Sequence, residues 1–139
     1  MIVLDTNVVS EPLRSRPDPR VLAWLDRQAA ETLFLTAVSL AELLAGVEKL
    51  PAGRRRKGLE MAMADLVGAL FGARILAFDE QAARGFARIA AGPSSRGQAI
   101  SLFDGQIAAI TAAHGFSIAT RDAAPFAAAE IPVIDPWRE

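Results

Sequence analysis

The chain has no cysteine and a single histidine, His114, among its 139 residues. Without cysteine there is neither a disulfide nor a thiolate metal site, which suits a reducing compartment. His114 stands next to Gly115, a residue type that ends helices, where a partly charged imidazole complements the helix dipole. We therefore expect His114 to be structural. Hydrolysis without a metal normally needs both a general base and a general acid, so any hydrolysis by this chain would depend on metal-activated water.

The sequence also has little excess charge and no long apolar run. Its formal net charge is −1, whereas proteins that hold duplex DNA usually carry a basic excess. Stable binding of a DNA duplex is therefore disfavoured. No segment approaches the ~20 apolar residues that span a bilayer, and the N-terminus lacks the basic and apolar segments of a signal peptide. We expect a soluble, cytoplasmic protein with no membrane partner.

The apolar residues, 52% of the chain, suit one domain over residues 1–139 with a hydrophobic core. Short apolar runs alternate with segments of helical periodicity, which predicts an α/β fold with a mainly parallel sheet. Strands are expected at residues 2–4, 33–35, 75–78, 116–119 and 133–134. The expected helices include one opened by Ser39, one near residues 54–71, one capped by Asp79 and one over residues 101–114, with a loop over residues 92–95.

Three acidic residues follow expected strands. Asp5 comes directly after the first strand, where Thr6 and Asn7 are expected to cap a helix, and Asp122 lies just past the fourth strand. Glu42 falls in the first turn of the helix after the second strand. Because the carboxyl ends of parallel strands share one edge of the sheet, these three acids can converge there.

A fourth acid, Asp104, stays undecided by spacing. It lies in the first turn of the helix that precedes the fourth strand. We expect a helix that feeds this strand directly to start at the opposite edge of the sheet. Residues 92–100 would then have to carry the chain back across the edge for Asp104 to approach the other acids.

Each acid also has a structural interpretation. Ser39 and Glu42 have the spacing of a capping box, and Ser101 and Asp104 have a looser version of it. Asp122 is a loop acid beside an arginine, a common arrangement at a protein surface.

The four acids are more informative together than singly. Asp5 is the hardest to explain structurally, because a carboxylate next to a buried strand is costly unless it is paired. Carboxylate oxygens are ligands for Mg²⁺ or Mn²⁺. A divalent cation would relieve the repulsion among several carboxylates and could polarise a phosphate and activate a water molecule.

Four segments resemble the motifs of PIN-domain proteins. They are Ile2–Val8, Ser39–Leu43, Ser101–Ala109 and Ala119–Asp122. The stretches Ser10–Arg14 and Leu50–Arg56 look most like the VapC/FitB branch of the family, the toxin halves of toxin–antitoxin pairs. The motifs occur in order, and the resemblance covers nearly the whole chain.

The resemblance implies a three-layer α/β/α sandwich with a parallel sheet of four or five strands. It places Asp104 in an acidic pocket with Asp5, Glu42 and Asp122, and it gives Thr6 a role in holding Asp5 or the metal's water. It implies Mg²⁺- or Mn²⁺-dependent hydrolysis of RNA phosphodiester bonds, leaving 5′-phosphate and 3′-hydroxyl ends. It also implies a homodimer and a cognate antitoxin that blocks the pocket.

The chain departs from the family around its fourth motif. Many relatives carry a later acid where this chain has Pro125, and Asn is common where it has Asp122. We assign the fourth carboxylate to Asp122 and leave the number of metal ions open. Gly105 stands where Ala is usual, which would loosen the first helical turn slightly.

Two other functions remain as alternatives. The departures leave room for a non-catalytic binding module that sequesters RNA or a protein partner. A Mg²⁺-dependent phosphatase would be expected to show Asp-x-Asp after its first strand, and the run Asp5-Thr6-Asn7 speaks against it.

A basic cluster and two tryptophans are further candidates for RNA contact. The cluster comprises Arg54, Arg55, Arg56 and Lys57. It could follow an RNA backbone, or it could be a solvated helix start, although basic residues there oppose the helix dipole. We expect Trp24 in the core, whereas Trp137 either packs or stacks on bases.

Overall fold

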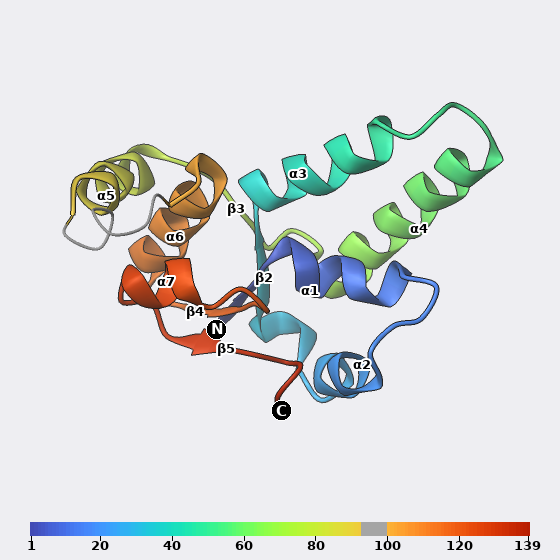
Figure 1. Cartoon of the computed structure of the whole chain (residues 1–139), viewed down its shortest axis with the longest axis horizontal. Helices are drawn as coiled ribbons and strands as arrows, with labels where there is room; N and C mark the ends of the chain where they lie inside the picture. Colours follow the sequence, from blue (N-terminus) through green and yellow to red (C-terminus); the bar gives the residue numbers. More distant parts are fainter. Residues whose placement is uncertain (93–99) are drawn as a thin grey trace.

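The computed structural model describes residues 1–92 and 100–139. Its centre is a sheet of five strands, all parallel, in the order β3-β2-β1-β4-β5 (Figure 1). The strands are β1 (Ile2–Leu4), β2 (Leu33–Thr36), β3 (Ile75–Leu76), β4 (Ser117–Ala119) and β5 (Val133–Ile134). The predicted parallel α/β fold is confirmed.

Helices cover both faces of this sheet. They are α1 (Thr6–Ser10), α2 (Pro19–Asp26), α3 (Ala37–Glu48), α4 (Arg54–Phe71), α5 (Glu80–Ala91), α6 (Leu102–His114) and α7 (Ala124–Ala128), with the 3-10 turns η1 (Glu11–Leu13) and η2 (Ala30–Thr32). Helices α5, α6 and α7 lie on one side, and α1 to α4 lie on the other (Figure 1). None of the helices in the described residues is long and apolar enough to cross a bilayer.

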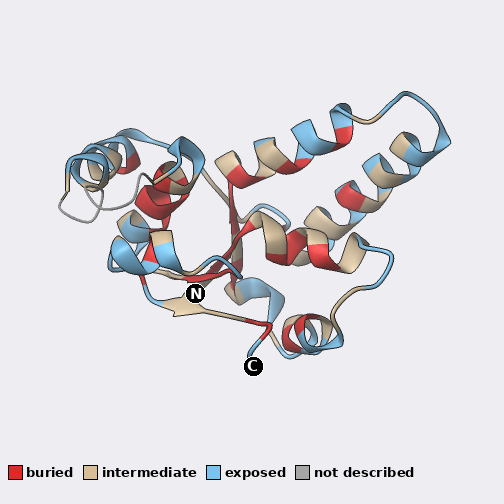
Figure 2. Ribbon diagram, in the orientation of Figure 1, coloured by how far each residue is buried: buried red, intermediate tan, exposed pale blue. Residues whose placement is uncertain are grey.

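The domain has two hydrophobic cores, one on each face of the sheet, because the side chains of the central strands point alternately to the two faces. Successive side chains of a strand point to opposite faces of its sheet. Val3 accordingly packs with α6 and α7, whereas Leu4 packs with α1 to α4. Both residues are completely buried, and Figure 2 shows the central strands as the most buried part of the chain. The sequence pattern thus produces three layers, with β1 in the middle.

The elements differ from the prediction at their ends. Strand β3 is two residues shorter than expected, and α7 was not anticipated. Helix α3 begins at Ala37 rather than at Ser39. The expected loop over residues 92–95 lies, from residue 93 onward, outside the described residues. These shifts matter for function only at α3, where they change the position of Glu42 in its helix.

Gly105 has a packing role that the sequence did not reveal. A Cβ atom added at this position would lie 2.8 Å from Cε2 of Phe86 on α5. Gly105 therefore lets α5 and α6 approach closely near the start of α6.

Candidate active site at the carboxyl edge of the sheet

Asp5 is the most deeply buried of the candidate site residues, with 5% of its surface exposed. Its Oδ1 accepts a hydrogen bond of 2.8 Å from the backbone N–H of Thr6, and Asp5 itself is the N-cap of α1. The prediction that Thr6 and Asn7 cap this helix is wrong, because α1 begins immediately after β1 and an aspartate is a strong N-cap. The contact that Thr6 makes with Asp5 is through its backbone.

The second oxygen of Asp5 is held by Thr120, which sequence reasoning missed. The Thr120 hydroxyl donates a hydrogen bond of 2.7 Å to Oδ2 of Asp5, and Thr120 is completely buried. Leu4 of β1 is in register with Ala119 of β4, so the residues that follow them meet at the sheet edge. A polar residue directly after the fourth strand was the signal that could have identified Thr120.

Thr120 and Asn7 also fix the segment that carries the fourth acid. The Thr120 Oγ1 accepts hydrogen bonds from the backbone N–H of Asp122 at 3.1 Å and from the side-chain amide of Asn7 at 3.4 Å. The Asn7 Oδ1 in turn accepts a bond of 3.4 Å from the backbone N–H of Arg121. Residues 120–122 are thereby attached to the first turn of α1, with Asp122 exposed at the rim of the site.

Glu42 lies in the second turn of α3 and takes no part in capping. The cap is Thr36, whose Oγ1 accepts a bond of 3.0 Å from the backbone N–H of Ser39. The capping box predicted for Ser39 and Glu42 is therefore wrong: the helix starts at the end of β2, where Thr36 already satisfies a free N–H group. The structural explanation of Glu42 disappears, and its half-buried carboxylate is free to act in the site.

Asp104 lies at the same edge as Asp5, a position that spacing alone had left undecided. Helix α6 ends at His114, two residues before β4 begins at Ser117. A helix feeding a parallel strand ends at the edge where that strand begins, so its start lies at the carboxyl edge. Its 13 residues rise about 1.5 Å each and cover the depth of the sheet, so Asp104, in the first turn of α6, lies near the carboxyl edge. The predicted cap is confirmed: Ser101 Oγ accepts from the Asp104 N–H at 3.1 Å.

Electrostatic coupling shows that the fold brings the four acids together. Burial is the main cause that raises the pKa of Asp5, and the charges of Asp104 and Asp122 raise it further, against the hydrogen bonds from Thr120 and Thr6. Burial also raises the pKa of Glu42, followed by the charges of Asp5 and Asp104. Asp5 thus interacts with each of the other three carboxylates.

This donor set fits a hydrated Mg²⁺ or Mn²⁺ better than a fully enclosed ion. All the candidate ligands are carboxylate oxygens, which these hard cations prefer. In the described part of the chain, however, no three acidic or histidine side chains are arranged to hold a metal directly. Mg²⁺ retains several waters and needs only one or two carboxylate ligands.

The basic cluster of residues 54–57 is not part of this site. It forms the first turn of α4, at the end of the α3–α4 pair farthest from the sheet (Figure 1). Arg56 forms ion pairs with Glu48 and Glu60, whereas the cluster's other members, Arg54, Arg55 and Lys57, are exposed. Contact between this cluster and RNA stays a prediction, and the fold separates the cluster from the carboxylates.

The remaining candidates lie away from the carboxylates or are covered. His114 is in the last turn of α6, at the opposite edge of the sheet from Asp104, with its ring centroid 5.3 Å from that of Phe116. Trp24 belongs to the core, as expected. Trp137 is 6% exposed and packs in the same core, so of its two alternatives packing is the one that the fold adopts.

Comparison with known proteins gives a consistent result over the length of the chain. The family model described as "PIN domain" matches residues 2–131. A relative from Sinorhizobium fredii described as "VapC ribonuclease Y4jK" is 46% identical over 99% of this chain and 98% of its own. The "Toxin FitB" of Neisseria gonorrhoeae is 42% identical over the full length of both chains.

Solved structures agree with these relatives. The structure described as "Crystal Structure of FitAcB from Neisseria gonorrhoeae" has a TM-score of 0.93 and 42% identity, and each chain is covered completely. That described as "Structure of FitAB bound to IR36 DNA fragment" has a TM-score of 0.92 and 43% identity over 99% of this chain and 96% of the other. The likeness therefore extends from sequence to fold over nearly the full length of the chains.

Proposed function

The chain belongs to the PIN-domain family, and we propose that it is a metal-dependent endoribonuclease acting as the toxin of a toxin–antitoxin pair. The observation that carries the proposal is the coupling of Asp5 to the carboxylates of Asp104 and Asp122, and of Glu42 to Asp5 and Asp104. The identity of 46% to a relative described as a ribonuclease supports the same activity.

The carboxylates would differ in how they hold a metal ion, because they differ in how firmly the fold fixes them. When bound, Mg²⁺ or Mn²⁺ would polarise the scissile phosphate and make an attacking water more acidic. Asp5 is the best-fixed ligand, because Thr6 and Thr120 orient one oxygen each. Glu42 and Asp104, which are half-exposed, would help to hold the ion, directly or through its water molecules.

Asp122 orients the attacking water from the rim of the site. It is exposed, and its backbone is fixed by Thr120. The water oxygen would form a bond to phosphorus and release a proton to solvent, as the bond to the 3′-oxygen breaks and that oxygen takes a proton from solvent. The products carry a 5′-phosphate and a 3′-hydroxyl.

A protein partner is the second part of the proposal. Two similar structures are described as complexes of FitA and FitB, and we propose a cognate antitoxin that covers the carboxylates here, with the toxin itself a homodimer. Leu102 and Phe103, beside Asp104, support contact at this place, since they are 61% and 50% exposed. Large apolar side chains exposed next to a polar site are typical of a protein interface.

A non-catalytic binding module is the second candidate function. It is favoured by Pro125, which stands in α7 at the position where many relatives carry a later acid. Such a protein would retain the fold and bind RNA or a protein without turnover. Metal-dependent cleavage separates the two candidates.

The decisive test is RNA cleavage by antitoxin-free protein in Mn²⁺, in Mg²⁺ and in EDTA. Asp5→Asn is prepared in parallel, and Asp65→Asn, an equivalent change at an exposed position on α4, is the matched control. We expect cleavage that requires metal, is lost in Asp5→Asn and is retained in Asp65→Asn. Equal cleavage by all three proteins would reveal a contaminating nuclease. Intact RNA with retained Mn²⁺ binding would favour the binding module.

A further inference from the structure

The four carboxylates need a cation beside them if the site is to accept RNA. One divalent ion leaves the group negatively charged, and each nucleotide adds a further negative charge. Enzymes that transfer or hydrolyse phosphate esters use arginine or lysine to hold such groups. The basic cluster of α4 is too distant to serve, so the cation must come from the rim of the site.

Arg121 is a basic residue in the segment that carries the fourth acid. It immediately precedes Asp122, and its backbone N–H is bonded to Asn7. Its side chain is exposed, and its guanidinium carbon lies 5.3 Å from the centroid of the Trp137 ring. A guanidinium stacked on an aromatic face keeps its N–H donors available at its edge. Arg121 is therefore held in place without its donors being used.

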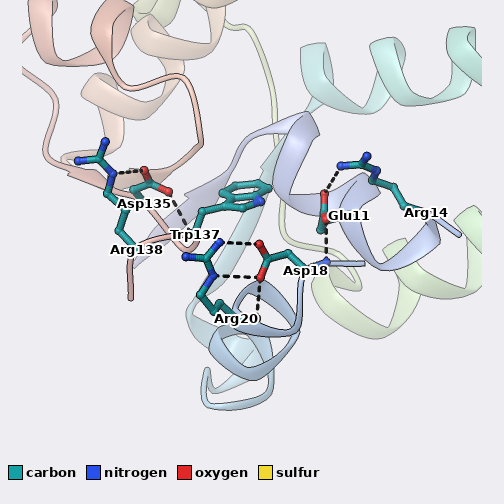
Figure 3. Close-up of polar contacts among 7 residues, drawn as sticks. All are labelled: Glu11, Arg14, Asp18, Arg20, Asp135, Trp137 and Arg138. Carbon is teal, nitrogen blue, oxygen red and sulfur yellow. Dashed lines mark hydrogen bonds and ion pairs between the residues drawn. The ribbon is translucent and has the colours of Figure 1, made fainter. Parts of the chain in front are cut away.

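The acids around Trp137 are occupied by other partners. Asp18 is bonded to the guanidinium of Arg20 at 2.8 and 3.2 Å, and Asp135 is paired with Arg138 and accepts from the backbone N–H of Trp137 (Figure 3). Arg121 is close enough to contribute to the lowered pKa of Asp18, after the larger effect of Arg20. Within the described residues, however, Arg121 forms no ion pair of its own. The guanidinium of Arg121 is therefore available to a further partner.

We propose that Arg121, held on the ring of Trp137, binds a phosphate of the RNA backbone adjacent to the phosphate that is cleaved. The inference rests on the proposed ribonuclease function and adds the residue that holds the substrate. A phosphate fits the planar donor edge of a guanidinium in two-pronged geometry. Such a contact positions the strand without reading its bases, so single-stranded DNA of the same sequence would use it as well.

The test measures binding separately from cleavage. A fluorescein-labelled single-stranded RNA is titrated with the full chain in Ca²⁺, which takes oxygen ligands as Mg²⁺ does, at a series of salt concentrations. The variants are Arg121→Gln and Arg121→Lys. Arg84→Gln removes the same charge from an exposed residue of α5, where Arg84 pairs with the exposed Glu80, and it is the matched control. Thermal unfolding checks that each variant is folded.

We expect Arg121→Gln to weaken RNA binding and to reduce the slope of log K against log salt by about 0.7, the effect of one single-strand phosphate contact. Arg121→Lys should recover part of the slope, and Arg84→Gln should match the wild type. An unchanged slope in a folded Arg121→Gln protein would overturn the proposal. So would unchanged RNA binding with weakened binding of the co-purified antitoxin, which would make Arg121 a protein contact.

These outcomes are separate from those of the cleavage test. Arg121-dependent RNA binding by a protein that never cleaves RNA would support the phosphate contact and count against the nuclease. Metal-dependent cleavage by a protein whose RNA binding does not depend on Arg121 would support the nuclease and overturn the phosphate contact.

Discussion

The hydroxyl of Thr120 donates a hydrogen bond of 2.7 Å to Oδ2 of Asp5 across 115 positions of sequence. The same oxygen atom of Thr120 accepts from the backbone N–H of Asp122 and from the amide of Asn7. Because these two donors occupy its acceptor positions, the hydroxyl hydrogen can point only to Asp5. The orientation of the buried carboxylate is thus set by a residue that carries no charge and ligates no metal.

Replacing Thr120 by valine should weaken Mn²⁺ binding about tenfold or more, the usual effect of losing a group that orients a metal-ligating side chain. The side chain keeps its shape, but the Oδ2 atom of Asp5 and the Asp122 N–H lose their partner. We also expect about 1–3 kcal/mol lower stability, because buried polar groups are left unsatisfied. Calorimetric titration with Mn²⁺ measures the affinity directly.

Thr120→Ser is the matched control, since it keeps the hydroxyl and removes only the methyl group. It should bind Mn²⁺ nearly as tightly as the wild type. If valine and serine variants bind Mn²⁺ equally well, Thr120 has only a structural role.

Asp122→Asn should move the pH dependence of metal binding to lower pH. The charge of Asp122 contributes to the raised pKa of Asp5, and metal binding requires the deprotonated carboxylate. Removing that charge lowers the pKa of Asp5, so Asp5 is deprotonated, and Mn²⁺ affinity rises, at a lower pH than in the wild type. Titrations with Mn²⁺ at several pH values locate the midpoint. A midpoint shifted to higher pH would contradict the position of Asp122 beside Asp5.

The stability of the metal-free protein should fall as the pH increases through the raised pKa of Asp5. Between the ordinary value of 3.8 and the raised value, the folded state binds a proton that the unfolded state has released, so the slope of unfolding free energy against pH is negative there. Asp5→Asn should reduce this slope. Urea unfolding in EDTA across this pH range measures it, and a slope as steep as that of wild type would show that burial of Asp5 is not its cause.

Mn²⁺ should raise the unfolding temperature of the wild type and much less that of Asp5→Asn, because a ligand that binds only the folded state stabilises it by mass action. Asp65→Asn again provides the control for loss of one negative charge. Thermal unfolding with increasing Mn²⁺ gives the comparison, and equal stabilisation of all three proteins would place the metal elsewhere.

Gly105→Ala should destabilise the fold although alanine favours helices. The added Cβ would lie 2.8 Å from the Phe86 ring, and overpacking of this kind costs about 1–3 kcal/mol, against about 1 kcal/mol gained from helix propensity. Gly58→Ala is the control, because a Cβ there meets nothing within 4 Å and should stabilise α4. Thermal unfolding of the two variants should therefore shift in opposite directions.

The sequence alone determined the class of the fold and the position of Asp5. The β-branched run before Asp5 and the alternation of strands and helices are local patterns, which depend on neighbouring residues of the chain. The family resemblance, confirmed by the comparisons, placed Asp104 in the site, whereas spacing had left its position undecided. Spacing could not decide because we expected a helix that feeds β4 directly to start at the opposite edge, and the short connection from His114 to Ser117 shows that this expectation is wrong.

The tertiary structure decided the contacts that make these acids a site. Thr120 reaches Asp5 because β1 and β4 are adjacent and in register, and Trp137 supports Arg121 because the C-terminal segment packs into the core. Glu42 became available once Thr36 proved to be the helix cap. Helix periodicity and strand patterns fix which face of an element is buried, but not which elements become neighbours. Hydrogen bonds between distant residues depend on that arrangement, and no local pattern in the chain encodes it.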